Sequence, residues 1–280
     1  MKYHLSKASI FSVVMALCFF IGALVLSANM SEPSSAVTRD QSTTNNTSDS
    51  ELPAHMPNDN YALGEYYFIQ NTDSADRYDL QKAKYYFLEA IKENPTQHNK
   101  AFYNVGRIDL VKSRFVSAIY HFEKQQEYFG DDIPNVYYML GLTYGFFALE
   151  TDSQQHWQLA EENFIRFMEY SPESAWPRVD LAWVYFSQGK YEAMLPILEK
   201  GLEHNPEQAW LLNTYGLALL NTGDKEAARQ AFLRAQQAYK KLTVGDWQQA
   251  YVENDPQSWN RNFELFGDII ESNLFLASQE

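Results

Sequence analysis

Cysteine is almost absent from this sequence of 280 residues. The one cysteine, Cys18, lies inside an apolar run near the N-terminus, so the rest of the chain has no thiol. This absence excludes disulfides, thiol catalysis and cysteine-ligated metals from the residues that follow. Any domain there must be stabilised by packing alone.

Positive charge is also scarce. The chain has 22 Lys and Arg against 36 Asp and Glu, which gives a formal net charge of −14. Such an acidic surface repels phosphate backbones and anionic lipid headgroups. We therefore expect no nucleic-acid partner, and we expect membrane contact only through the apolar N-terminal run.

The sequence lacks the residue patterns that perform chemistry. The histidines after residue 50 are dispersed, and no two of them are four residues apart, the spacing that places two metal ligands on one helix face. No glycine-rich phosphate loop or Gly-x-Ser-x-Gly turn is present. We predict no catalytic residues, no metal site and no cofactor, and a protein that is not an enzyme.

A two-helix pattern that recurs five times is the main positive feature. The first helix of each unit has a small residue within an apolar stretch, and these are Gly64, Gly106, Gly141, Ala182 and Gly216. The second helix has two inner residues four positions apart, which share one helix face. These pairs are Ala83 and Phe87, Ala118 and Phe122, Ala160 and Phe164, Met194 and Leu198, and Ala228 and Phe232. One unit cannot bury its own apolar face, so the units must stack.

Units four and five resemble the tetratricopeptide repeat family most closely. The family pattern of Leu-Gly, Tyr, Ala, Phe, Ala and Pro extends over 34 residues. Its matches are Leu181, Tyr185, Gly189, Leu198 and Pro206 in unit four, and Tyr215, Gly216, Ala228, Phe232 and Ala235 in unit five. The resemblance implies an all-α fold, a right-handed α-solenoid of about five antiparallel helix pairs over residues 58–240. The predicted repeats are 58–95, 98–130, 134–172, 174–206 and 207–240.

Units one and three are longer than the others. The small residue and the inner alanine are 19 positions apart in these units (64 to 83, 141 to 160) and 12 apart in unit two (106 to 118). The excess of seven is close to two helical turns, so one extra turn on each helix would keep the inner faces in phase. A loop at 71–76 or 151–155 is the alternative.

The first 30 residues differ from the rest and predict a signal anchor or transmembrane helix. Residues 8–31 have no charge, and the uninterrupted apolar core at 10–26 is just long enough to span a bilayer. Lys2 and Lys7 precede the core, which keeps the N-terminus in the cytoplasm. The prediction is a single-pass inner (cytoplasmic) membrane protein that contacts the bilayer through residues 8–28 and has its repeats in the periplasm. The alternative is secretion to the periplasm after cleavage of a signal peptide.

Two further segments complete the domain organisation. Residues 31–57 are rich in Ser, Thr, Asn and Pro and cannot bury enough apolar surface to fold, so we predict a disordered tether. Residues 241–280 contain apolar side chains at helical spacing from Trp259 to Leu276, which predicts a C-terminal capping helix. The alternative is that this helix lies inside the groove or contacts a partner.

The family resemblance also implies a concave groove lined by the first helix of each pair. Carried over by position, its candidate peptide- or partner-binding residues are Tyr61, Glu65, Lys100, Tyr103, Asn104, Arg107, Tyr138, Trp176, Trp183, Trp210 and Asn213. Aromatic residues and arginine contribute most to binding energies, and asparagine can bond a peptide backbone. Lys100, Asn104 and Arg107 partly match the clamp with which some family members hold a C-terminal carboxylate. The alternative is that Trp176, Trp183 and Trp210 only pack between helices or under the C-terminal segment.

These features favour a membrane-tethered scaffold that holds a peptide or partner subunit of an envelope assembly. The identity of the partner does not follow from any residue. A self-associating structural protein, and so a homo-oligomer, is the second hypothesis.

Overall fold

Every regular element of the part of the chain that the structure describes is a helix. The structure is a computed structural model that describes residues 57–68, 77–250 and 256–279. No helix among these residues has the length and apolar character needed to cross a bilayer. The predicted anchor and nearly all of the predicted tether lie outside the described residues.

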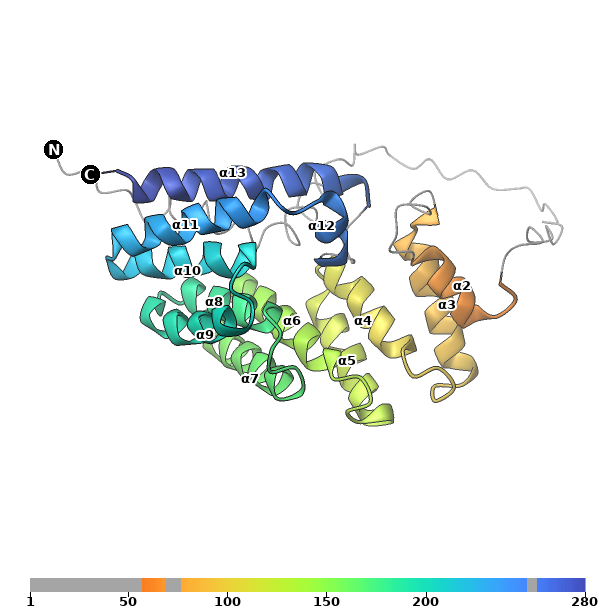
Figure 1. The fold of residues 1–280 in the computed structure, drawn as a ribbon. Helices are drawn as coiled ribbons and strands as arrows, with labels where there is room; N and C mark the ends of the chain where they lie inside the picture. The colour runs from red at the N-terminus through yellow and green to blue at the C-terminus, as the bar shows by residue number, and fades with distance from the viewer. Residues whose placement is uncertain (1–56, 69–76, 251–255, 280) are drawn as a thin grey trace, which may run out of the picture.

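Ten of these helices form five consecutive antiparallel pairs (Figure 1). The pairs are α2 (Asn60–Tyr67) with α3 (Leu80–Glu93), α4 (Ala101–Val111) with α5 (Phe115–Phe129), α6 (Asn135–Thr151) with α7 (Gln154–Tyr170), α8 (Trp176–Ser187) with α9 (Tyr191–His204), and α10 (Ala209–Thr222) with α11 (Lys225–Tyr239). Each second helix also packs on the first helix of the next pair. The predicted all-α stack of helix pairs is confirmed.

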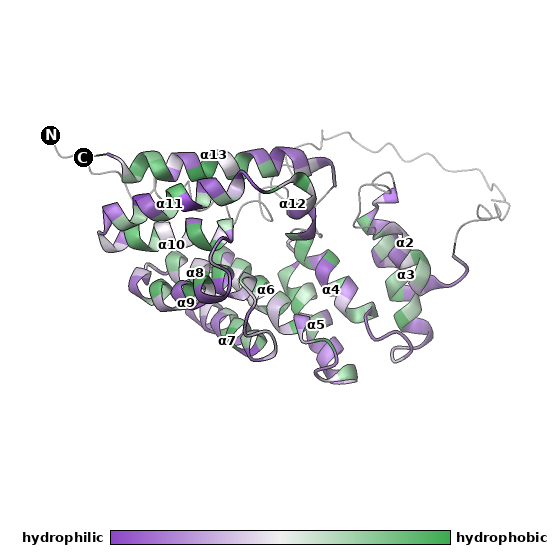
Figure 2. Cartoon of the chain, in the orientation of Figure 1, coloured by the Kyte–Doolittle hydropathy of each residue, from purple (hydrophilic) through white to green (hydrophobic). Residues whose placement is uncertain are grey.

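The inner residues of the repeat pattern form the core of each pair. All ten residues of the predicted second-helix pairs, from Ala83 to Phe232, have at most 1% of their surface exposed. The first helices approach them closely, because a Cβ atom added at Gly106 would lie 2.5 Å from the Phe122 ring. Hydrophobic residues therefore recur along each helix on the sides that meet other helices (Figure 2).

The turns within four of the pairs each contain a residue with positive φ. A residue with positive φ lies between the two helices of units two to five: Ser113 (51°), Asp152 (51°), Gly189 (73°) and Gly223 (99°). Glycine adopts this conformation without a steric penalty, and Asp tolerates it better than most residues. The turns then start the second helices with side-chain caps in units three and five, where Ser153 and Asp224 accept hydrogen bonds from backbone N–H groups.

Unit three has the two extended helices that its long spacing predicts. Relative to the inner residues, α6 continues to Thr151, ten residues after Gly141, whereas α10 continues only six residues after Gly216. The helix α7 likewise begins six residues before Ala160, whereas α11 begins three before Ala228. In unit one α2 ends at Tyr67 and α3 begins three residues before Ala83, so neither helix is extended. The extra residues of unit one lie between its helices.

The C-terminal region lies along the last pair. It comprises α12 (Val244–Ala250), the 3-10 turn η2 (Pro256–Ser258) and α13 (Trp259–Ala277). The helix α13 packs on α11 and also contacts α10, which is where the first helix of a sixth unit would lie (Figure 1). Its inner face includes the buried residues Trp259, Phe266 and Ile270.

Candidate functional site

The first helices of the five pairs, α2, α4, α6, α8 and α10, carry the predicted groove residues. Those residues fall into three groups along the stack: one on α2 and α4, one on α6 and α8, and one on α10. The groups differ in what their side chains contact.

The group on α2 and α4 is centred on Arg107. The Arg107 guanidinium carbon lies 4.8 Å above the Phe68 ring centre and 5.4 Å from that of Tyr103, and Nη1 donates to Asn104 Oδ1 at 3.3 Å. Rings next to a guanidinium favour its charge and fix its orientation. Tyr103, Asn104 and Arg107 are buried, at 7%, 5% and 9% exposure. The sequence pattern and the structure thus bring these three residues together.

Tyr61 joins this group from α2. Its ring stacks on His98 with the centres 4.3 Å apart. Burial and the carboxylate of Glu65 raise the pKa of Tyr61, while Arg107 and a hydrogen bond with Asn104 oppose that rise. Glu65 and Lys100 are both exposed. The group therefore offers aromatic, amide, cationic and anionic groups on two adjacent units.

The second group couples α6 to α8. The Tyr138 hydroxyl donates to Asp180 Oδ2 at 2.5 Å, and its ring lies 5.8 Å from Phe164 and 5.4 Å from Phe167. Trp176, at the start of α8, is half-buried and its ring centre is 5.0 Å from that of Trp210. This group places a carboxylate between tryptophans on the face of α8.

Trp183 belongs to the packing between α6 and α8. It is 5% exposed, and its ring would be 2.6 Å from a Cβ atom at Gly145. It also lies 5.0 Å from Phe146 and 6.1 Å from Trp157. The absence of a side chain at Gly145 is what lets the indole fit between the two helices.

The third group lies beneath the C-terminal helices. Trp210 is 5% exposed and stacks on Phe266 of α13 at 5.0 Å. Asn213 is fully buried, and Asn273 of α13 donates to its Oδ1 at 2.9 Å. The predicted groove residues of unit five are thus covered by the protein itself.

Asp180 was not among the groove residues predicted from the sequence. It precedes the small residue Ala182 by two positions, as the predicted groove residue Asn104 precedes Gly106. The same position in the repeat would therefore have predicted Asp180 as a groove residue. It also follows Trp176 by one helical turn, which places both on one face.

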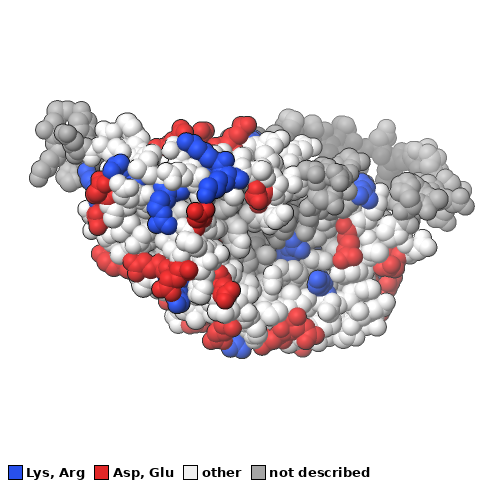
Figure 3. All heavy atoms as spheres, viewed as in Figure 1, with Lys and Arg blue, Asp and Glu red and all other residues white. Residues whose placement is uncertain are grey.

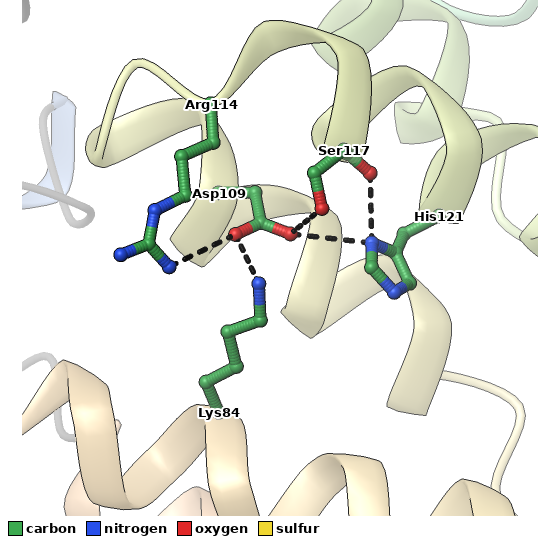
Figure 4. Close-up of polar contacts among 5 residues, drawn as sticks. All are labelled: Lys84, Asp109, Arg114, Ser117 and His121. Carbon is green, nitrogen blue, oxygen red and sulfur yellow. Dashed lines mark hydrogen bonds and ion pairs between the residues drawn. The ribbon is translucent and has the colours of Figure 1, made fainter.

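A second polar cluster lies between units one and two and is structural (Figure 4). The fully buried Asp109 pairs with Lys84, accepts a hydrogen bond from Ser117 at 2.7 Å and lies 3.2 Å from His121 Nδ1. Burial alone would raise the pKa of Asp109, but the bonds from His121, Lys84 and Ser117 outweigh it and keep the pKa below its usual range. The Ser117 hydroxyl bonds the carboxylate, not the imidazole, so no base faces a nucleophile.

Other chemistry-bearing clusters are few within the described ranges. No group of three or more His, Cys, Asp and Glu residues there could hold a metal ion. Acidic side chains are spread over the face drawn in Figure 3, in keeping with the composition.

Comparison with known families supports the repeat assignment. Residues 179–242 match the family model described as Tetratricopeptide repeat. This segment covers units four and five, where the sequence pattern is clearest. A search of curated proteins gives no match.

Solved structures with the tetratricopeptide repeat fold resemble most of the stack. TTC0263, described as a thermophilic TPR protein in Thermus thermophilus, has a TM-score of 0.51 at 15% identity over 74% of this chain and 96% of its own. A structure of MamA protein has a TM-score of 0.50 at 20% identity over 63% of this chain and 91% of its own. A second MamA structure gives 0.51 at 20% identity, over 60% and 94%. These similarities show the fold, an all-α tetratricopeptide-like solenoid.

Proposed function

We propose that this chain is a non-enzymatic scaffold that binds a peptide segment or partner subunit along the wall formed by α2, α4, α6 and α8. The observation that supports it best is the group around Arg107. Aromatic rings fix the guanidinium, and Asn104 and Tyr61 add hydrogen-bonding groups beside it. Rigid aromatic and arginine side chains of this kind dominate the energetics of protein interfaces.

The function can be tested with a displayed library of random peptides and the full-length chain purified in detergent. We expect the wild type to enrich peptides, and we expect Arg107→Ala to lower their affinity at least tenfold. The control is Tyr120→Ala, which removes a ring that is 53% exposed on α5. Thermal melting would show that both variants are folded. The proposal fails if no peptide is enriched, or if Arg107→Ala binds as well as Tyr120→Ala.

We also propose that residues 8–28 anchor the scaffold in the inner membrane with the repeats in the periplasm. The support is the uncharged run preceded by Lys2 and Lys7. N-terminal sequencing of the mature protein separates an anchor from a cleaved signal peptide. Protease added to intact spheroplasts should digest the repeats if the orientation is correct.

Self-association is a second candidate function, and the second helices favour it. Tyr85 and Tyr120 are 60% and 53% exposed at equivalent positions of α3 and α5, and Val116 is 69% exposed. Large apolar side chains exposed on the second helices, which form the outer side of the stack, are typical of interaction surfaces. Sedimentation of the full-length chain over a range of concentrations tests this function, and Val116→Ser combined with Tyr120→Ser should abolish any oligomer.

A further inference from the structure

Asp180 is an acidic side chain of the groove wall that pairs with no cation within the described ranges. It is half-buried on α8, one turn after Trp176 and one turn before Trp183. Its only described side-chain bond is the one from the Tyr138 hydroxyl to Oδ2. Among the residues that the structure describes, it forms no salt bridge.

The side chains described next, on α6, α8 and α10, do not provide a cation for the Asp180 carboxylate. Arg178, two residues earlier on α8, donates to the Ser174 carbonyl at 2.7 Å and packs against the backbone of Gly201. The helix α6 contributes the neutral Tyr138, and α10 contributes Trp210 beside Trp176. Asp109 differs in this respect, because Lys84, His121 and Ser117 surround it.

The one described partner of this carboxylate, the Tyr138 hydroxyl, is neutral. Burial raises the pKa of Asp180 to about 7, although the bond from Tyr138 lowers it. A cation placed beside the carboxylate would restore its ionised form through a charge-assisted hydrogen bond. Tryptophan faces attract cations as well, and Trp176 lies one turn away.

We propose that Asp180 receives a lysine or arginine side chain of the bound peptide, with Trp176 beside the cation. This inference rests on the proposed function, since it names the residue type that the groove selects. It also distinguishes the group on α6 and α8 from the group on α2 and α4, because the latter has its own cation in Arg107.

The test extends the peptide selection to this residue. Wild-type protein should enrich peptides with lysine or arginine at one fixed position, and Asp180→Asn should lose that enrichment. Replacing this lysine by norleucine in a selected peptide should weaken wild-type binding roughly tenfold and leave Asp180→Asn unaffected, which is the coupling expected of a direct pair. Wild-type affinity for the lysine peptide should also rise from pH 6 to pH 8 as the carboxyl group ionises, with no such rise in Asp180→Asn.

One control variant accompanies Asp180→Asn. Glu271→Gln removes the same charge from the exposed face of α13 and should keep the lysine preference. If it lowers the preference as much as Asp180→Asn does, the acidic surface as a whole attracts the peptide and the inference is wrong.

The outcomes separate this inference from the function on which it rests. If the wild type enriches peptides without a basic position, groove binding stands and the role of Asp180 is wrong. If the wild type enriches no peptide, the proposed function and this inference fall together.

Discussion

Gly106 and Phe122 illustrate how single residues set the distance between helices. The added Cβ atom at Gly106 would be 2.5 Å from a ring that is fully buried, and the ring has no room to move away. Close packing of this kind leaves no tolerance for an extra carbon. The repeat pattern therefore needs a small residue at this position, because a larger side chain would clash with the aromatic ring of the second helix.

We expect Gly106→Ala to lower the free energy of unfolding by about 1–3 kcal/mol, because overpacking forces the helices apart. Chemical denaturation followed by circular dichroism measures the change. The matched control is Gly245→Ala in α12, where the nearest neighbour, Thr243 Oγ1, is 3.4 Å from the added carbon. Equal stability of the two variants would contradict the steric argument.

Asp109 is the residue whose loss should be most costly among the polar groups. Asp109→Asn leaves the Lys84 ammonium, whose side chain is 18% exposed, without its charge partner. Breaking a buried pair on one side costs about 3–5 kcal/mol. The double variant Lys84→Met with Asp109→Asn should cost less than the sum of the single changes.

The same pair predicts a dependence on pH. The pKa of Asp109 in the folded state is below its ordinary value, so the stabilisation is present at neutral pH and is lost as the pH falls below about 4. The stability difference between wild type and Asp109→Asn should therefore shrink between pH 7 and pH 3 in urea denaturation. A constant difference would show that the carboxylate is not held ionised by its neighbours.

Helices meet at junctions between units, and the junctions are not alike. The residue one position after the inner alanine of a second helix, or after Met194 in unit four, faces the next unit. The residue three positions after the small residue of a first helix faces the preceding unit. At the junction of units one and two these are Lys84 and Asp109, and at that of units three and four they are Glu161 and Tyr185, which share a hydrogen bond of 2.5 Å. The corresponding residues at the other two junctions are Ile119 with Tyr144, and Leu195 with Leu219. Polar pairs that fit only one neighbour help to fix the order of similar units.

The helix α13 is the element whose removal should have the widest effect. Truncation before Pro256 exposes Trp210, Asn213 and the apolar side of α11, so we expect binding of a hydrophobic dye, association of the protein and a lower melting temperature. Removal of residues 278–280 alone is the control and should change none of these. A monomeric truncation with unchanged melting would show that α13 is not needed as a cover.

The stack as a whole is stabilised by contacts between neighbours. Each pair contacts the preceding and following elements, and no described pair contacts a distant one to any great extent. In such arrays a local change weakens the adjacent units first. The stability of each unit thus depends on its contacts with the adjacent units.

Hydrogen exchange measured by mass spectrometry can test this locality. Asp109→Asn should increase exchange in α2 and α3 far more than in α10 and α11, since the lost pair joins the first unit to the second. The control Gly245→Ala should not change exchange in α2 or α3. A uniform increase over the stack would show that the molecule unfolds as one cooperative unit.

The sequence predicted the packing of the molecule better than its accessible wall. Phe87, Phe122 and Phe232 were identified because every unit repeats the same internal contact, and the repetition makes the signal visible. A C-terminal capping helix was predicted, but its hydrogen bond to Asn213 could not be, because Asn273 is 60 residues away in a segment without repeats. The group around Asp109 likewise brings together three helices; the repeat register places Lys84 and Asp109 opposite each other, but it does not show that they pair or that Ser117 and His121 join them.

The place of α13 has a consequence for growth of the stack. In units one to four, the second helix packs against the first helix of the next unit. Without α13, the equivalent surface of α11 would be open, and α2 of another molecule could pack there. Head-to-tail addition of this kind has no natural end and produces filaments. By lying on α11 with Arg261, Asp268 and Glu271 exposed on its other side, α13 blocks head-to-tail addition of a second molecule at this surface.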